Sequence, residues 1–497
     1  MTGVPYEEWL ARAERLDPCT GLHIDGAFSA GAGTLPVVSP RDGRTIARVA
    51  AAGAADVDRA VAAARRAFDE GPWPRLAPAE RKAALLRLAA LVERDRATLS
   101  LLVSLEMGKP IGEAYGIELR AVIGCLRWYA EAADKQLDES PRTGEGSLAL
   151  VTREPVGVVA AVVPWNFPLL MAAWKLAPAL AAGCAVVLKP AEESPLSALH
   201  LAALAAEAGL PPGVFNVVSG RGEVAGRALG EHPGVDAVAF TGSGEVGRHF
   251  LRYAAGSNLK RVWLELGGKS PNIILPDAPD LDAAADTAAW GIFFNAGEMC
   301  TAPSRLLVHR SVADRVLDRI VARAGTIRVG DPLDPATEMG PLVSAAQRER
   351  VLSYVADGGA AGARLRAGGD GRPGGVHDAG QFVKPTVFDR VGPEMRIARE
   401  EIFGPVLAVL EFADADEAVR LANDTDYGLA AAVWTSDLST AHRVSRALKA
   451  GTVWVNCYEE GDMSVPFGGM RQSGHGRDKS LHALDKYTEL KTTWITL

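Results

Sequence analysis

From residue 156 onward, short apolar runs alternate with amphipathic stretches of helical length. The strand-like runs are Val156–Val163, Ala185–Lys189, Val214–Val218 and Ala237–Phe240. The helical stretches that follow them are Leu169–Ala182, Pro195–Ala208, Glu223–Leu229 and Glu245–Ala254. This strand–helix repetition predicts a mostly parallel sheet with helices on both of its faces.

A second alternating series begins near Leu264 and continues to about residue 470. It contains Asn272–Leu275, Leu281–Phe294, Arg305–His309 and Val312–Ala324. The sequence therefore predicts two α/β lobes, with a ligand crevice at the carboxyl ends of the strands or between the lobes. Residues 55–70 and 78–107 have helical spacing, the latter with one break, and Ala367–Gly380 is a glycine-rich surface loop.

Composition excludes several classes of function. The 53 Lys and Arg residues are outnumbered by 61 Asp and Glu residues, giving a net charge of −8 and no basic field for nucleic acid or an anionic membrane. Five cysteines in 497 residues are too few for a disulfide framework and indicate a cytoplasmic protein. The nine histidines are scattered, and without HExxH or CxxC motifs no metal site is expected.

The uncharged segment Pro155–Trp174 has the length of a membrane span. Pro164, Asn166 and Pro168 lie at its centre, where they would leave backbone groups unpaired in lipid. We interpret the segment as a buried strand, a loop and a helix.

Residues 242–247 read GSGEVG, which has the form GxGxxG, and they follow a strand-like run and open a helical stretch. Such glycines let phosphate approach the N-terminus of a helix. A tight glycine-rich turn explains the same pattern, so the motif alone leaves both interpretations open. Gly268-Lys269-Ser270 is not a P-loop, because position 263 is Trp263 rather than glycine.

Three side chains stand out as carriers of chemistry. Cys300 lies in a glycine-containing loop after a helical stretch, Glu265 lies between two leucines, and Asn166 lies between prolines in PWNFP. An exposed thiol is a nucleophile, an acid in an apolar setting has a pKa raised toward that of a general base, and an amide is a donor. Taken singly, each also fits a structural role: a buried thiol, a buried or surface acid, or an amide holding its own turn.

Seven segments in one order carry more information than any of them alone. They are PWNFP at 164–168, LKPAE at 188–192, FTGS at 240–243, LELGGK at 264–269, the loop of Cys300, EEIFGPV at 400–406 and PFGG at 466–469. With this set the sequence resembles the aldehyde dehydrogenase superfamily from about residue 20 to the C-terminus.

The resemblance implies a reaction scheme. Cys300 would attack the aldehyde carbonyl to give a thiohemiacetal, and Asn166 with the backbone N–H of Cys300 would stabilise the oxyanion. Hydride transfer to nicotinamide would leave a thioester, and Glu265 would activate the water that hydrolyses it. Lys175 and Asp478 would lie on the proton path.

The resemblance also implies a cofactor site. Lys189 and Glu192 would contact the adenosine ribose, Ser243 the pyrophosphate, and Glu401 and Phe403 the nicotinamide ribose and ring. Glu192 near the 2′-hydroxyl would repel a 2′-phosphate, which favours NAD over NADP. In this family the phosphate-binding glycines depart from the usual Rossmann geometry, so the GxGxxG pattern is partly coincidental. The other expected cofactor contacts are Val163, Pro164, Trp165, Gly222, Phe240, Thr241, Gly242, Val246, Leu266 and Gly267.

Three positions depart from the commonest family pattern. Ala296 replaces a frequent glutamine, Pro303 a frequent glycine and Asp478 a frequent glutamate. None of these changes removes a reacting atom.

The fold implied by the resemblance has two Rossmann-like, doubly wound parallel-sheet domains and a small β extension for oligomerisation. The cofactor domain would cover 5–136 and 156–264, the catalytic domain 265–470, and the extension 137–155 with 484–497. Residues 487–497 have the β-branched content of a strand, and an exposed edge strand is normally paired. A homo-oligomer, dimer or tetramer, is therefore expected.

The substrate expectation comes from residues 456–497, which resemble the 4-(γ-glutamylamino)butanal and 4-guanidinobutanal dehydrogenases of polyamine and arginine breakdown. Glu459, Glu460 and Asp462 cluster where the tunnel mouth would lie, and carboxylates there favour a nitrogen-bearing aldehyde. A solvated acidic loop explains the charges equally well. The expected substrate contacts are Phe167, Met171, Trp174, Thr301, Glu459 and Phe467.

Other outcomes stay open at this point. The chain fits a broad-specificity aliphatic aldehyde dehydrogenase, a coenzyme A-acylating relative or a relative that lost catalysis. Glu265 argues against acylation of coenzyme A, because a base at that position serves hydrolysis. The intact set of Asn166, Glu265 and Cys300 argues against loss of catalysis.

Overall fold

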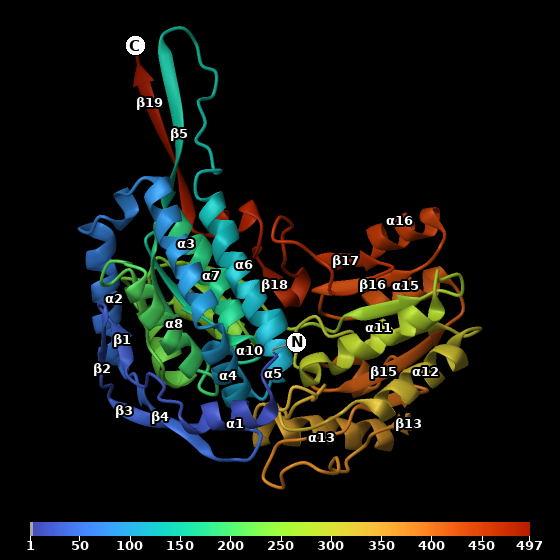
Figure 1. Ribbon diagram of the computed structural model, residues 1–497. Coiled ribbons are helices and arrows are strands. Elements are labelled where there is room, and N and C mark those ends of the chain that lie inside the picture. Colours follow the sequence, from blue (N-terminus) through green and yellow to red (C-terminus); the bar gives the residue numbers. More distant parts are fainter. Residues whose placement is uncertain (1–2) are drawn as a thin grey trace.

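The computed structural model describes residues 3–497, which form two α/β bodies and a projecting β arm (Figure 1). The first sheet has the strand order β18-β10-β9-β6-β7-β8-β1-β2. Its five central strands are mutually parallel: β10 (Arg261–Glu265), β9 (Ala237–Thr241), β6 (Val158–Val162), β7 (Ala185–Lys189) and β8 (Phe215–Val217). The antiparallel edge strands are β18 (Gly474–His475), β1 (Leu22–Ile24) and β2 (Ala27–Ser29).

Side chains from the central strands alternate between two apolar cores. Val159 and Ala161 of β6 face the core formed with helices α3 (Pro78–Arg94), α6 (Leu119–Ala132), α7 (Pro168–Ala182) and α8 (Leu196–Glu207). Val158 and Ala160 face the opposite core, which includes α2 (Ala54–Asp69) and α10 (Gly244–Ala255). Because both faces are covered, the strands read as continuous apolar runs rather than as alternating ones.

The second sheet has the order β13-β14-β15-β12-β11-β16-β17, and only the β13–β14 pair is antiparallel. Its strands are β13 (Arg364–Ala367), β14 (Thr386–Asp389), β15 (Val406–Phe412), β12 (Arg305–His309), β11 (Pro271–Ile274), β16 (Ala430–Trp434) and β17 (Thr452–Val455). Its helices are α11 (Leu281–Phe293), α12 (Ala313–Thr326), α13 (Ala345–Ala360), α14 (Arg396–Arg399), α15 (Ala415–Asn423) and α16 (Leu438–Ala447).

The predicted alternation is confirmed, with local differences. The one break expected within 78–107 is found at Asp95, between α3 and α4 (Arg96–Met107). The predicted helix Glu223–Leu229 is a π-helical turn, Gly222–Gly226, continued by α9 (Arg227–Glu231). Apart from the arm and several short 3-10 and π-helical turns, the remaining elements are α1 (Tyr6–Glu14), β3 (Gly33–Val38), β4 (Thr45–Ala51) and α5 (Ile111–Glu113).

The uncharged segment before residue 174 contains β6, a loop and the first turns of α7, as interpreted from the sequence. Among residues 3–497, no helix is both long enough and apolar enough to cross a membrane.

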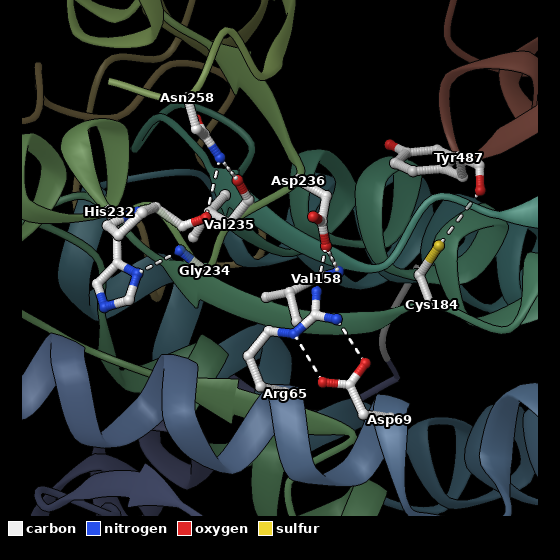
Figure 2. Close-up of polar contacts among 11 residues, drawn as sticks. Arg65, Asp69, Val158, Cys184, His232, Gly234, Val235, Asp236, Asn258 and Tyr487 are labelled. Carbon is white, nitrogen blue, oxygen red and sulfur yellow. Dashed lines mark hydrogen bonds and ion pairs between the residues drawn. The ribbon is translucent and has the colours of Figure 1, made fainter. Parts of the chain in front are cut away.

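Polar contacts connect the first sheet to the residue before the last strand and to helix α2. Figure 2 shows Cys184 Sγ donating to the carbonyl of Tyr487, 3.3 Å away, just before the last strand. In the same view Asp236 accepts from the backbone N–H of Val158 at 2.7 Å and from Arg65, which ties α2 to the sheet. The Cys184–Tyr487 contact joins the first body to the residue that precedes β19 (Thr488–Thr496).

The arm consists of β5 (Ser147–Pro155) and β19 (Thr488–Thr496), paired antiparallel along their whole length. Figure 1 shows it projecting from the body with the C-terminus near its end. Leu490, Trp494 and Leu497 are 62%, 61% and 78% exposed. The arm therefore carries apolar side chains that this chain does not cover.

Candidate active site

A strained loop presents Cys300. After α11 ends, Asn295 (φ 49°), Ala296 (φ 53°) and Gly297 (φ 72°) all adopt left-handed conformations. A Cβ on Gly297 would collide with the backbone of Gly404, so only glycine permits this approach. The loop leads directly into Cys300, which is half-buried.

Asn166 lies directly against this loop. It follows β6 in the turn before α7, and its Nδ2 donates to the carbonyl of Glu298 at 2.8 Å. The backbone oxygen of Asn166 accepts from Lys109 Nζ at 3.0 Å and from Asn295 Nδ2 at 3.2 Å. Because an amide nitrogen carries two hydrogens, one stays available for a substrate oxygen while the other holds the loop.

Carboxyl groups surround the thiol. Burial, together with the charges of Glu265, Glu459 and Glu401, raises the pKa of Cys300 well above its ordinary value. Burial and the charge of Asp478 raise the pKa of Glu265 to about 8, and its Oε1 has no hydrogen-bond partner among the described residues. Glu265, at the end of β10, thus has the apolar setting of a base that works near neutral pH.

Asp478 has a different environment. Both of its carboxylate oxygens accept from lysines, Oδ2 from Lys175 at 2.5 Å and Oδ1 from Lys486. Burial would raise the pKa of Asp478, but the two ammonium groups lower it. Glu265 and Asp478 line one small cavity together with Lys175, Arg477 and Lys486. The structure thus joins the predicted base to the predicted proton path.

The predicted adenosine-ribose contacts lie together at the carboxyl end of β7. Lys189 Nζ lies 3.3 Å from Glu192 Oε2, and Glu192 Oε1 accepts from the backbone N–H of Gly222. Val163 donates its N–H to the carbonyl of Lys189 at 3.1 Å. A partly exposed carboxylate here suits ribose hydroxyl groups.

The glycine motif forms the start of α10. Ser243 caps the helix by accepting from the N–H of Val246 at 3.3 Å, and the N–H of Gly242 donates to the carbonyl of Glu265 at 3.1 Å. A Cβ on Gly242 would lie 2.5 Å from the ring of Phe240. Phe240 and Thr241 end β9 immediately before this turn. A helix N-terminus at a sheet edge suits a pyrophosphate.

The predicted nicotinamide contacts lie nearer the thiol. Glu401 Oε1 accepts from the N–H of Gly268 at 3.0 Å, and a Cβ on Gly267 would collide with the carboxylate of Glu401. The rings of Trp165 and Phe403 meet edge to face at 5.3 Å. Leu266 donates its N–H to the carbonyl of Ser473, and Pro164 begins the turn of Asn166. The donor set fits a dinucleotide laid from Glu192 toward Cys300.

Aromatic side chains form the predicted substrate wall. Phe167 packs on Phe294 at 6.3 Å and Trp174 on Phe467 at 5.2 Å, while Met171 is buried on α7. Phe467 is also bridged to Asp478 by two backbone hydrogen bonds of 2.7 Å. The wall is therefore attached to the proton path.

The three acids of residues 459–462 divide into two kinds. Glu459, at φ 59°, has a buried Oε1 without a hydrogen-bond partner among residues 3–497, and its pKa is raised to about 7 by burial although Thr301 and Lys479 lower it. Glu460 and Asp462 are exposed, so a solvated loop explains their charges. Only Glu459 points at the candidate site.

Sequence reasoning missed three buried groups that support the predicted residues: Lys109, Asn295 and Lys486. Lys109 stands between glycine and proline at the end of α4, where an exposed lysine would be ordinary. Its 1% exposure is the only signal that sets it apart, and burial is a property of the fold.

Comparison with known proteins agrees with this geometry. Residues 28–493 match the aldehyde dehydrogenase family. The chain belongs to that family. Its catalysis is therefore NAD(P)-dependent oxidation of an aldehyde, and two bodies with an extra β arm are the family's fold.

Individual relatives sharpen the picture. The chain is 51% identical to the NADP/NAD-dependent aldehyde dehydrogenase PuuC of Escherichia coli, over 98% of both chains. It is 56% identical to an indole-3-acetaldehyde dehydrogenase whose structure contains NAD+, with a TM-score of 0.98 over 99% of this chain and 100% of that one. It is 58% identical to a γ-glutamyl-γ-aminobutyraldehyde dehydrogenase of Burkholderia cenocepacia, with a TM-score of 0.97 over the same shares. NAD+ is therefore bound by one of these relatives, and PuuC is named for both NADP and NAD.

Proposed function

We propose that this aldehyde dehydrogenase oxidises an aldehyde that carries a hydrogen-bond-donating nitrogen, such as 4-(γ-glutamylamino)butanal, in the breakdown of polyamines or arginine. The observation that carries this proposal is the buried Oε1 of Glu459 beside Thr301 and Cys300, which has no partner within the described part of the chain. An unpaired buried acceptor is costly, and an ammonium, guanidinium or amide N–H of the substrate would satisfy it.

In the reaction we assign, the Cys300 sulfur attacks the aldehyde carbon, and the thiol proton leaves to Glu265 or to water in the adjoining cavity. The free hydrogen of Asn166 Nδ2 and the backbone N–H of Cys300 stabilise the oxyanion of the thiohemiacetal. When bound, NAD+ accepts the hydride that this carbon gives up. Glu265 then takes a proton from the water that hydrolyses the thioester, and the cavity that it shares with Lys175 and Asp478 lets that proton leave.

The cofactor would lie along the expected cofactor contacts, from Glu192 at one end to Glu401 at the other. Glu192 and Lys189 would hold the adenosine ribose, the start of α10 the pyrophosphate, and Glu401 with Phe403 the nicotinamide end. The Glu192 carboxylate favours NAD over NADP by charge repulsion of a 2′-phosphate.

We further propose a cytoplasmic homo-oligomer, dimer or tetramer, in which the apolar side chains of the β5–β19 arm are covered by another copy. Residues 5–136 and 156–264 would bind the cofactor, 265–470 would carry catalysis, and 137–155 with 484–497 would bridge subunits. Light scattering at several protein concentrations tests the assembly, and a monomer throughout contradicts it.

The substrate test compares four-carbon aldehydes with and without a nitrogen at the far end of the chain. The wild-type kcat/KM for 4-(γ-glutamylamino)butanal or 4-aminobutanal should exceed that for butanal by about 10-fold or more, since a charged or polar hydrogen bond contributes about 1.5 kcal/mol. Glu459→Leu removes the acceptor oxygens, one of which glutamine would keep, so it should abolish most of that preference and leave butanal oxidation within about 2-fold.

Glu460→Leu is the matched control, because the neighbouring carboxylate is exposed. It should leave both values unchanged. Equal preference of the wild type for all three aldehydes, or for indole-3-acetaldehyde over them, contradicts the substrate proposal and favours a broad-specificity or aryl aldehyde dehydrogenase.

A further inference from the structure

A buried ion pair lies behind the turn that carries Asn166. Lys109 and Glu118 are 1% and 0% exposed, and the Lys109 ammonium donates to a carboxylate oxygen of Glu118. The pair lies beside the loop of residues 295–300, called here the nucleophile loop, because Lys109 and Asn295 donate to the same backbone oxygen of Asn166. Burying two charges is costly unless further hydrogen bonds satisfy them, so the remaining contacts of the pair show what it holds.

The other hydrogen bonds of the pair, and the cation–π contact of Lys109, involve residues 166–170. Lys109 Nζ donates to the backbone oxygen of Asn166 at 3.0 Å and lies 3.6 Å above the ring of Phe167. The other carboxylate oxygen of Glu118 accepts from the N–H groups of Leu169 and Leu170 at 3.1 and 3.2 Å. The carboxylate thereby satisfies the first turn of α7, whose N-cap position, Phe167, makes no side-chain cap.

The same oxygen of Asn166 is shared with the nucleophile loop. Asn295 Nδ2 donates to it at 3.2 Å and to the carbonyl of Glu298 at 3.2 Å, while Asn166 Nδ2 donates to that carbonyl at 2.8 Å. Asn166 is therefore held in two places: Lys109 bonds to its backbone oxygen, and the carbonyl of Glu298 bonds to its side-chain amide. With the first Nδ2 hydrogen bonded to Glu298, the direction of the second hydrogen is fixed by the planar amide group.

We propose that Lys109 and Glu118 are positioning residues that fix the Asn166 amide at the place where the substrate oxyanion forms. This inference rests on the proposed role of Asn166. An oxyanion donor is effective only when it is aimed before the reaction, and a displacement of about 1 Å can cost about 100-fold in rate. A lysine that touches neither substrate nor cofactor would thus act on the acylation step.

A double-mutant cycle tests the proposal. Lys109→Met with Glu118→Gln removes both charges of the ion pair together, so neither partner is left buried without the other, and the amide oxygen of the introduced glutamine can still accept from α7. We expect kcat/KM for the aldehyde at saturating NAD to fall about 10-fold or more, with an unchanged KM for NAD. In an Asn166→Ala background the same pair of changes should cost less than about 2-fold, because the group that it aims is absent.

Lys260→Met is the matched control for loss of a buried lysine. Lys260 Nζ donates to the carbonyl of Gly230 at 2.6 Å and to Ser257, and nothing in our assignment of the reaction involves it. It should lower thermal stability and leave kcat/KM within about 2-fold.

Two results would overturn the inference: an equal loss of kcat/KM in both backgrounds, or no loss when Asn166 is present. If the paired variant does not fold, Glu118→Gln alone can be used in the same double-mutant cycle. It weakens the interaction with Lys109 and keeps the size and shape of the side chain. The Asn166→Ala variant by itself separates the two claims. If it keeps full activity, the proposed function fails at the oxyanion donor; if it is impaired and the cycle is additive, only the positioning role fails.

Discussion

Two buried carboxylates face the same cavity and are set to opposite protonation states. Glu265 has an oxygen without a hydrogen-bond partner among the described residues, and burial raises its pKa to about 8. Asp478 is equally buried, but Lys175 and Lys486 lower its pKa. Burial alone therefore does not decide the charge of an acid; the cations within hydrogen-bond distance do. One carboxylate can exchange protons near neutral pH, and the other is a fixed anion.

The largest expected effect concerns the thiol that Glu265 faces. Cys300→Ser should lower kcat by about 1000-fold or more, because a hydroxyl is a far weaker nucleophile than a thiolate. Fluorescence titration with NADH should show unchanged cofactor affinity. Substantial turnover by this variant would mean that Cys300 is not the nucleophile.

Next comes Glu265 itself. Glu265→Gln should lower kcat by about 100-fold or more by blocking hydrolysis of the thioester, since general-base catalysis contributes about 100- to 10,000-fold. Rapid mixing should still show a first turnover of NADH. Loss of that burst would indicate that Glu265 acts before the thioester forms, for example by accepting the thiol proton of Cys300.

Asp478→Asn tests whether Asp478 is the charged partner of Lys175 and Lys486. It leaves Lys175 and Lys486 buried without a counter-charge, so we expect a loss of about 3–5 kcal/mol in the free energy of unfolding at pH 7. Glu265→Gln removes no paired charge and should cost much less. Urea denaturation of both variants gives the values, and equal losses would contradict the assigned charge states.

A pH dependence of stability, comparable in size to the effect of Asp478→Asn, follows from the raised pKa of Glu265. The folded protein keeps the proton of Glu265 up to a pKa of about 8, whereas the unfolded chain releases it near the ordinary value of 4.5. The contribution of this group is full below about pH 4.5 and is lost as pH rises to about 8. Wild type should lose stability over this range relative to Glu265→Gln. A parallel dependence of the two proteins would mean that Glu265 ionises normally.

The sequence predicted the interior of the fold better than its edges. β6, β7 and β9 are continuous apolar runs, so their identity as buried strands could be read directly. β1 and β2 have only three residues each, and β5 is recognisable chiefly by what it pairs with, so local patterns do not define them.

The candidate site shows the same division. The seven motif segments located Asn166, Glu265 and Cys300 by resemblance, and the structure brings their chain segments together. Local composition could not separate Glu459, which turns inward at φ 59°, from the exposed Glu460 beside it. Nor could it show that Lys109 and Lys486 are buried, because that follows from contacts between distant segments.

The most direct test of the central claim is mass spectrometry of Glu265→Gln mixed with NAD and an aldehyde substrate, quenched in acid and digested. We expect one NADH per subunit and an acyl group on the peptide of Cys300, with its mass that of the substrate acid minus water. Formation of NADH with an unmodified Cys300, or acylation of another residue, would contradict the account.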